Sequence, residues 1–426
     1  MLRRIVHNFA TRLGTAFLSF GVVWLTARYL GAAGRGAISL FVTDCAALLL
    51  FIGLLGGSSL IYLAPRRNLW HLLLPAYGWA VVVCIVGTAT VAGLRHPGPA
   101  YLWHLAGLST LQAFFSINTS LVLGRRREGT YNLLTLIQVG LLAGSLLVAF
   151  QTGGPGRSVQ AYYWSSYVAF GVPLLLSFIP LLRQPDRRRR WGRRLRATTR
   201  ELARHSRGAH LSNILAFANY RLSYYFVAHY VDLPSVGILS VGVALVEAIW
   251  LIPRSAALVQ YVDLVHSSAS SGPLPTGALR VARLAVLATA AAVGLLIALP
   301  VAVLTTVFGA EFGAARPVMV LLAPGAVIMA VQMVVSSYFA GRARYRVNNL
   351  ASVVGLGVTL LACPLLIPSY GIRGAALAAT LSYGASTAFL LLHFWRDTGA
   401  VPTAFLPGAA DVRYCWQLLR AQIEAK

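Results

Sequence analysis

Twelve apolar stretches of about 20 residues each run through this sequence, and they set the strongest limit on its fold. A helix of about 20 apolar residues is long enough to cross the ~30 Å hydrocarbon core of a bilayer. The stretches cover residues 5–27, 37–64, 70–94, 101–123, 131–151, 161–182, 209–231, 235–262, 284–309, 317–340, 347–368 and 374–394. We therefore expect an all-α integral membrane protein with about 12 transmembrane helices.

The composition excludes several other classes. Charged residues make up 11% of the chain and hydrophobic residues 58%, whereas soluble globular proteins contain about 25% charged residues. Four cysteines are too few for a disulfide scaffold. The sequence has no HExxH helix, phosphate-binding loop, paired-cysteine metal motif, GxSxG elbow or dinucleotide fingerprint. We expect no enzymatic activity, no cofactor and no metal site.

The basic residues predict the orientation in the membrane. The chain has 36 of them against 11 acidic residues. If the N-terminus is cytoplasmic, 28 fall on the cytoplasmic side and six on the outer side, and Arg221 and Arg254 lie inside spans. This asymmetry follows the positive-inside rule. It predicts that both termini are cytoplasmic, and it accounts for the basic charge without nucleic-acid binding.

One long basic connection divides the spans six and six. We expect an N-terminal six-helix lobe at 1–182, a cytoplasmic linker at 183–208, a C-terminal six-helix lobe at 209–394 and a cytoplasmic tail at 395–426. Four identities recur between the lobes at a constant offset of 201: Ala27, Tyr29, Gly36 and Ser39 against Ala228, Tyr230, Gly237 and Ser240. Equal numbers of spans in the same orientation suggest two pseudo-symmetric lobes around a central cavity.

The linker has two interpretations. It carries eleven arginines between residues 183 and 207. It can be a solvated loop that obeys the positive-inside rule. Alternatively, it forms an amphipathic surface helix on anionic lipid, with Trp191, Leu195 and Leu202 dipping into the membrane.

Charges deep within spans are costly, so Arg221 and Glu247 need an explanation. A charge at the bilayer centre costs roughly 2.5–3.5 kcal/mol on insertion scales. Their distances from the span ends place both side chains ~15–18 Å deep, at one level on neighbouring helices. They either form a structural ion pair, or Arg221 faces a cavity and binds an anionic substrate while Glu247 tunes it or carries a proton. Asp44, ~12 Å deep in the second span, is a further cavity candidate.

Other polar residues join this candidate substrate site. Arg254 either snorkels to the interface or lines the inward mouth of the cavity, and Arg28 lies near the outer end of the first span. Asn219, Tyr220 and Tyr224 add an amide and two aromatic rings to the seventh span. Such groups suit sugar contacts, but helix–helix hydrogen bonding and interfacial anchoring are equally ordinary roles for them.

Several short motifs carry a resemblance to a known family. They are Ala27-Arg28-Tyr29-Leu30-Gly31-Ala32-Ala33-Gly34-Arg35-Gly36-Ala37, then Glu247, Trp250 and Pro253, then Phe308-Gly309-Ala310-Glu311-Phe312, and finally Gly371-Ile372-Arg373-Gly374-Ala375-Ala376. In this order the chain, over about 1–394, resembles the bacterial polysaccharide flippases of the multidrug/oligosaccharidyl-lipid/polysaccharide (MOP) exporter superfamily.

The resemblance implies a MATE-like fold in a bacterial inner membrane. It also implies that the protein moves a polyprenyl-pyrophosphate-linked oligosaccharide to the outer leaflet by alternating access, without ATP hydrolysis, alongside polysaccharide assembly enzymes. Two alternatives stay open: an ion-coupled multidrug exporter of the same superfamily, and a membrane polysaccharide polymerase. The short outer loops argue against the polymerase.

Overall fold

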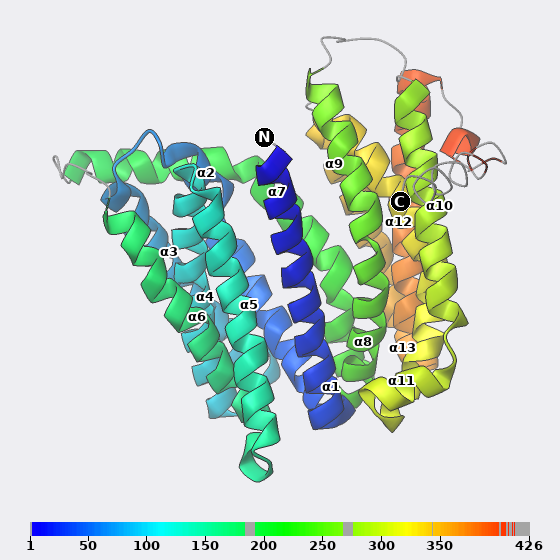
Figure 1. Cartoon of the computed structure of the whole chain (residues 1–426), viewed down its shortest axis with the longest axis horizontal. Coiled ribbons are helices and arrows are strands. Elements are labelled where there is room, and N and C mark those ends of the chain that lie inside the picture. Colours follow the sequence, from blue (N-terminus) through cyan, green and yellow to red (C-terminus); the bar gives the residue numbers. More distant parts are fainter. Residues whose placement is uncertain are drawn as a thin grey trace. The chain divides into compact units, whose positions relative to one another are not determined.

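Every regular element is helical in the part of the chain that the computed structural model describes, residues 2–183, 192–266, 276–342, 344–399, 402–405, 408, 411 and 413 (Figure 1). The chain divides into two compact units, Met1–Ile214 (unit 1) and Leu215–Lys426 (unit 2). The lobe and linker boundaries drawn from the sequence stay predictions.

The elements follow in chain order, and α7 begins in unit 1 and ends in unit 2. The first eight are α1 Leu2–Ile52, α2 Ser58–Leu63, α3 Leu69–Arg95, α4 Pro99–Gly124, α5 Glu128–Gln151, η1 Gly154–Gly156, α6 Val159–Leu182 and α7 Gly192–Tyr230. The remaining eight are α8 Leu233–Ile249, α9 Leu251–His266, α10 Thr276–Ala298, α11 Val301–Phe308, η2 Ala310–Ala314, α12 Ala315–Gly341, α13 Tyr345–Thr398 and η3 Pro402–Phe405.

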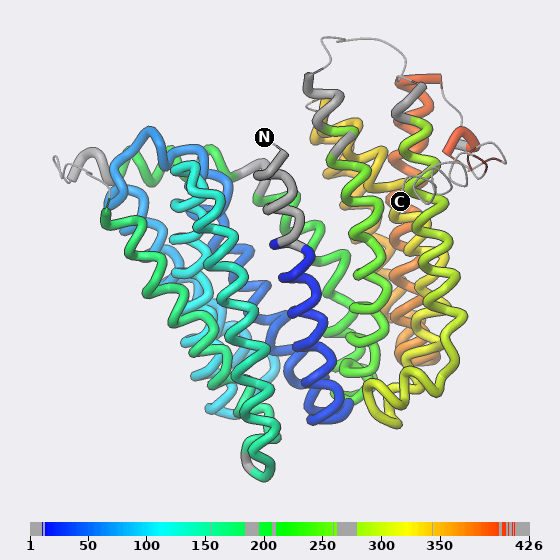
Figure 2. The backbone as a smooth tube through the Cα atoms, in the orientation of Figure 1, coloured from blue at the N-terminus to red at the C-terminus, as the bar shows by residue number. Residues whose placement is uncertain are grey.

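Two helices are too long to cross a bilayer once. The apolar stretch Leu13–Ile52 of α1 has 40 residues and α13 has 54, so each measures ~60 Å or more against a ~30 Å core. Each is divided by a glycine of positive φ, Gly31 at 68° and Gly371 at 56°. Glycine adopts this conformation without the steric cost of a Cβ. Figure 2 shows the tube turning back after the first stretch of α1. Each helix is therefore long enough for two passes.

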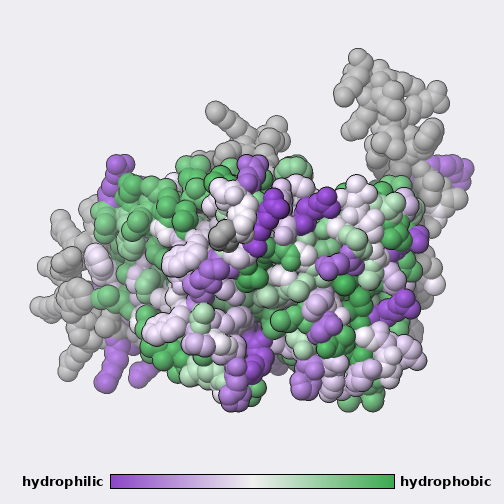
Figure 3. All heavy atoms as spheres, turned by 90° about the horizontal axis from the view of Figure 1, so that it is seen from below, coloured by the Kyte–Doolittle hydropathy of each residue, from purple (hydrophilic) through white to green (hydrophobic). Residues whose placement is uncertain are grey.

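The chain is a multi-pass membrane protein. Among the described residues, nine helical stretches are long and apolar enough to span a membrane, which confirms the predicted fold class. Two of the nine are the double-length stretches, and the predicted span at 209–231, which is rich in polar side chains, is not among them. The number of twelve crossings stays a prediction. Figure 3 shows hydrophilic side chains scattered among apolar ones on the face seen from below.

The second part of the short sequence repeat has the same burial in both units, whereas Ala27 and Tyr29 are more buried than Ala228 and Tyr230. The buried members are Gly36, Ile38, Ser39 and Leu40 in unit 1, and Gly237, Leu239, Ser240 and Val241 in unit 2. In each unit this segment opens the helical stretch that follows the first turn. The equal burial supports the interpretation of the motif as a structural repeat.

The first part of α7, residues 192–206, is called the arm here. It packs against unit 1: Leu202 is fully buried in a core that includes Leu60 and Leu63 of α2 and Leu72 of α3. The prediction that Leu202 dips into lipid is therefore wrong, because the apolar side of the arm is covered by protein. Trp191 and the Leu195 side chain lie outside what the structure describes.

Candidate functional site

Arg221 of α7 and Glu247 of α8 form a two-point ion pair within unit 2. Arg221 Nη1 donates to Glu247 Oε1 at 3.1 Å, and Nη2 donates to Oε2 at 2.9 Å. The parallel N–H···O bonds are the strong geometry for a guanidinium and a carboxylate. The contact that helix lengths predicted is confirmed. The roles of the two residues stay open, because a structural pair and a substrate site both place them together.

The pair remains partly open. The side chain of Arg221 is 32% exposed and that of Glu247 is 23% exposed. Tyr224, one turn along α7, is buried and accepts a 3.4 Å hydrogen bond from Arg221 Nη1. Its ring centroid lies 5.5 Å from the guanidinium carbon, within the range of a cation–π contact. Arg221 is thus held from two sides while part of its surface stays accessible.

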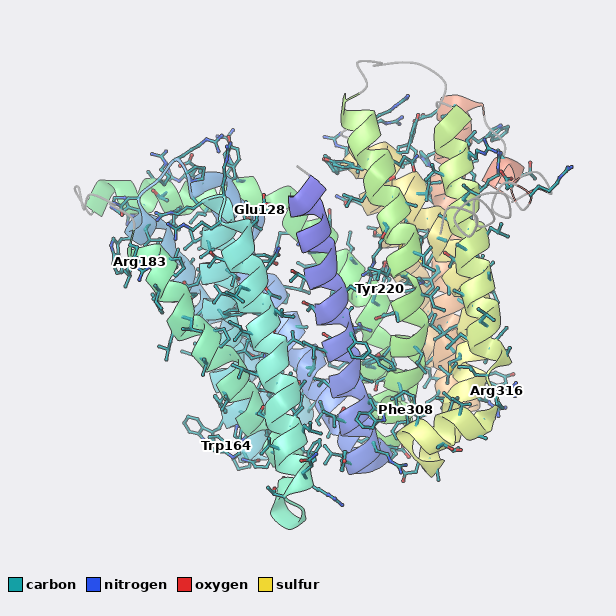
Figure 4. All side chains as sticks on the ribbon, in the orientation of Figure 1. Glu128, Trp164, Arg183, Tyr220, Phe308 and Arg316 are labelled. Atoms are coloured by element: carbon teal, nitrogen blue, oxygen red, sulfur yellow. The ribbon has the colours of Figure 1, made fainter. Side chains whose placement is uncertain are left out.

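A pocket lies beside the ion pair, and Glu247 forms part of its wall. Its polar and aromatic lining comes from α7 with Asn219, Tyr220 and Ser223, from α8 and its C-cap with Glu247 and Trp250, and from α13 with Thr359 and Tyr383. Leu322 of α12 and small residues of α13, among them Ala375 and Ala376, complete the wall. Figure 4 places Tyr220 between the two ends of the helices of unit 2, so this polar site lies at membrane depth.

Two buried polar atoms of the pocket have no hydrogen-bond partner among the described residues. Trp250 is 2% exposed, and its Nε1–H lacks an acceptor. Asn219 Oδ1 lacks a donor, although its Nδ2 donates to the Ser352 carbonyl at 3.0 Å. An unpaired donor and an unpaired acceptor lining one pocket are suited to a hydroxyl group, which can bind to both.

Three aromatic side chains of the pocket wall pack against one another. The ring centroids of Tyr220, Trp250 and Tyr383 lie 5.7–6.0 Å apart in each pairing. Met329 of α12 packs against the same cluster. The sequence identified Tyr220 as a candidate but missed Tyr383, because nothing in the chain before the fold is known relates α7 to α13.

Unit 1 contains a different arrangement around Asp44. Asp44 of α1 is 2% exposed and receives hydrogen bonds from Arg95 at the end of α3 and from the Tyr101 hydroxyl of α4. The Tyr101 ring packs edge-on to Phe41, with centroids 5.3 Å apart. Asp44 lines neither of the pockets described within the two units. The sequence does not reveal this pair, because Arg95 directly follows the predicted span at 70–94, where a base is expected in an outer loop.

For the remaining two candidates, Arg28 and Arg254, a substrate-binding role stays a prediction. Arg28 is exposed near the Gly31 turn of α1, and Arg254 is exposed on α9. Within the described part of the chain, no group of three or more His, Cys, Asp or Glu residues is placed to hold a metal ion.

The fold has known counterparts. No protein-family model matches the sequence, and no curated protein does. A multidrug resistance MATE family transporter of the MOP superfamily, solved facing inward, has a TM-score of 0.68 at 14% identity, over 90% of this chain and 94% of that one. The lipid II flippase MurJ, in an inward closed conformation, has a TM-score of 0.69 at 12% identity, over 95% and 89%. A Vibrio cholerae MATE transporter, VcmN, has a TM-score of 0.54 at 12% identity, over 93% and 97%. The chain therefore has the fold of MATE transporters and of MurJ.

Proposed function

We propose that the chain is a flippase that moves a polyprenyl-pyrophosphate-linked oligosaccharide from the cytoplasmic to the outer leaflet for surface polysaccharide synthesis. Two lobes would alternate access to the substrate without ATP hydrolysis. The observation that carries the proposal is the open Arg221–Glu247 pair beside a pocket with unpaired polar atoms. The fold shared with MurJ, a lipid II flippase, agrees with it.

Arg221 retains donors for an anion. A guanidinium has five N–H groups, and the hydrogen bonds to Glu247 and Tyr224 use three of them. The remaining N–H groups and the 32% exposed surface are available to a pyrophosphate. Arginine is well suited to phosphate because its planar fork can donate two parallel hydrogen bonds.

The pocket beside the pair, with a cavity volume of about 20 Å³, can admit a single hydroxyl group of the saccharide. Sugar hydroxyl groups donate and accept hydrogen bonds, and Trp250 Nε1–H and Asn219 Oδ1 offer the complementary atoms. Because the ion pair is neutral as a whole, the pocket itself favours a neutral polar group over a second charge.

A second candidate function is ion-coupled multidrug export. Glu247 lines the pocket among aromatic rings, and a carboxylate next to aromatic faces can bind a cationic drug. MATE transporters share this fold, which supports multidrug export as the second candidate. Expression in a host that lacks its own drug exporters separates the two functions: the flippase proposal expects no added resistance to the cationic dye ethidium.

The deciding experiment compares single and double variants at the pair. Arg221→Ala leaves a carboxylate without its partner and should lower the free energy of unfolding by about 1–3 kcal/mol, less than for a fully buried pair because both groups keep some solvent contact. Arg221→Ala with Glu247→Ala removes both charges and should restore the protein level but not polysaccharide export. Arg373→Ala, which removes an exposed arginine of α13, is the matched control and should leave both unchanged. Normal export by a stable double variant would overturn the proposal.

The proposed compartment is the bacterial inner membrane, with both termini cytoplasmic and polysaccharide assembly enzymes as associates. The 28-to-6 distribution of basic residues supports this orientation. Reporter fusions after residues 155 and 195 should therefore lie on opposite sides of the membrane. Finding both in one compartment would contradict the proposed topology.

A further inference from the structure

The arm of α7 has two opposite stripes of residues. Thr198, Leu202 and Ser206 are buried against unit 1, at 2%, 0% and 1% exposure. Arg196, Arg200 and Arg204 are exposed. The two sets are offset by two residues, or ~200° around a helix of 3.6 residues per turn. The arginines therefore point away from the protein.

Contacts on both sides of this row hold the arm in place. Arg67, in the turn after α2, pairs with Glu201 at 2.8 Å. The ring of Tyr62 lies 4.7 Å from that of His205, and the guanidinium of Arg66 lies 4.0 Å above the same Tyr62 ring. Through Tyr62, Arg66 therefore lies next to the row of exposed arginines on the arm. We call Arg66, Arg196, Arg200 and Arg204 the basic ledge.

The basic ledge is not neutralised by the protein that surrounds it. None of its four arginines has an acidic partner among the described residues, and Glu201 already pairs with Arg67. Like charges four residues apart on a helix repel each other. The arm also runs at the level of α2, at one end of the helices of unit 1 (Figure 1), where Glu128 and Arg183 lie as well (Figure 4). In a bilayer this end lies at the headgroup layer.

We propose that the basic ledge binds the headgroups of anionic phospholipids. A fixed row of arginines at headgroup level meets phosphate at high local concentration, which favours lipid over an acidic protein as the occupant. Binding is electrostatic and needs no insertion, because the apolar side of the arm is buried in unit 1. The inference is independent of the transported substrate. It also gives a reason for the burial of Leu202, which fixes the helix that carries these arginines to unit 1.

The test measures lipid selectivity directly. The purified protein is reconstituted in phosphatidylcholine bilayers with a trace of spin-labelled phosphatidylglycerol or phosphatidylcholine, and electron spin resonance gives the motionally restricted fraction of each. Wild type should retain phosphatidylglycerol preferentially at low salt, and 1 M salt should reduce the preference because the Debye length falls to about 3 Å. The triple variant Arg196→Gln, Arg200→Gln, Arg204→Gln should lower the preference at least about threefold, given the attraction of each base to an anionic leaflet.

A matched variant removes the same charge from unit 2. Arg280→Gln, Arg346→Gln, Arg396→Gln replaces three exposed arginines of α10 and α13 and should lower the preference less than the ledge variant does. An unchanged preference in the ledge variant would overturn the proposal. So would an equal loss in the control variant, or a preference that 1 M salt leaves intact. If export fails for other reasons, these outcomes do not change, so this test and that of the proposed function are separable.

Discussion

Both units hold an arginine–carboxylate pair with a tyrosine beside it, yet the two carboxylates differ in exposure. In unit 1 the carboxylate of Asp44 is 2% exposed, and Arg95 and Tyr101 enclose it. In unit 2 the carboxylate of Glu247 is 23% exposed, and Arg221 is 32% exposed next to a pocket. The carboxylate is thus buried in one unit and partly accessible in the other, whereas the two arginines are exposed to nearly the same extent, 30% for Arg95 and 32% for Arg221.

The difference separates two uses of a buried charge. A carboxylate that protein groups enclose can stabilise the contact between helices but cannot reach a substrate. A pair that stays partly exposed loses less of its hydration than a fully buried one, and its remaining N–H groups can still donate to a ligand. We therefore propose a structural role for the Asp44 pair and a binding role for the Arg221 pair. The following changes test that division.

The largest expected effect is in unit 1. Asp44→Leu removes the acceptor of the Tyr101 hydroxyl and of Arg95, and because Arg95 is 30% exposed and can reach solvent, it should lower the free energy of unfolding by about 1–3 kcal/mol. Asp44→Leu with Arg95→Leu removes both charges and should recover most of that loss together with normal export. Thermal unfolding in detergent and membrane protein level give the stability, and surface polysaccharide gives export.

Arg67→Leu serves as the control for these changes. Its pair with Glu201 is 48% and 29% exposed, so its loss should cost only about 0–1 kcal/mol. A stable Asp44→Leu, Arg95→Leu protein that fails to export would show that the Asp44 pair takes part in transport, and the division between the units would fail.

A smaller effect is expected from Arg221→Lys. Lysine keeps the positive charge, but its single ammonium cannot donate the paired hydrogen bonds to Glu247 and still present a planar fork to phosphate. Export should fall about tenfold, while the free energy of unfolding should fall by only ~1 kcal/mol. Arg95→Lys in unit 1 should leave export unchanged. Equal losses of export from both substitutions would remove the distinction between the two pairs.

Part of this comparison could be predicted from the sequence. Span lengths place Arg221 and Glu247 at one depth because a helix rises by a fixed 1.5 Å per residue, and the structure confirms the contact. The Asp44 pair was missed because its partner, Arg95, is 51 residues away and lies at a span end. From the sequence alone, a base at the end of a span can equally be a loop residue without a partner in the membrane.

Other features depend on packing that no single segment contains. The amphipathic pattern of the arm identifies an apolar side, but it cannot tell whether lipid or protein covers that side, so the interpretation that places Leu202 in lipid is wrong. The unpaired atoms of Trp250 and Asn219 arise where α7, α8 and α13 meet. An unsatisfied polar group is a property of its neighbours, and it becomes visible only once the neighbours are known.

The smallest expected effect on export, and the sharpest test of the pocket, comes from Trp250→Phe. Because Trp250 Nε1–H has no partner among the described residues, this change breaks no hydrogen bond of the protein. The free energy of unfolding should fall by only about 1–2 kcal/mol, because phenylalanine buries less ring area than tryptophan. If the N–H binds a substrate hydroxyl, export should still fall several-fold, since a buried hydrogen bond contributes about 0.5–1.5 kcal/mol. Tyr338→Phe is the matched control: its buried hydroxyl also lacks a partner, but it lies in a core with Phe339 and Phe394, away from the pocket. Removing it should leave export intact and stability equal or slightly higher. If both variants lower export in proportion to their loss of protein, Trp250 is a packing residue and the open pair acts without the pocket behind it.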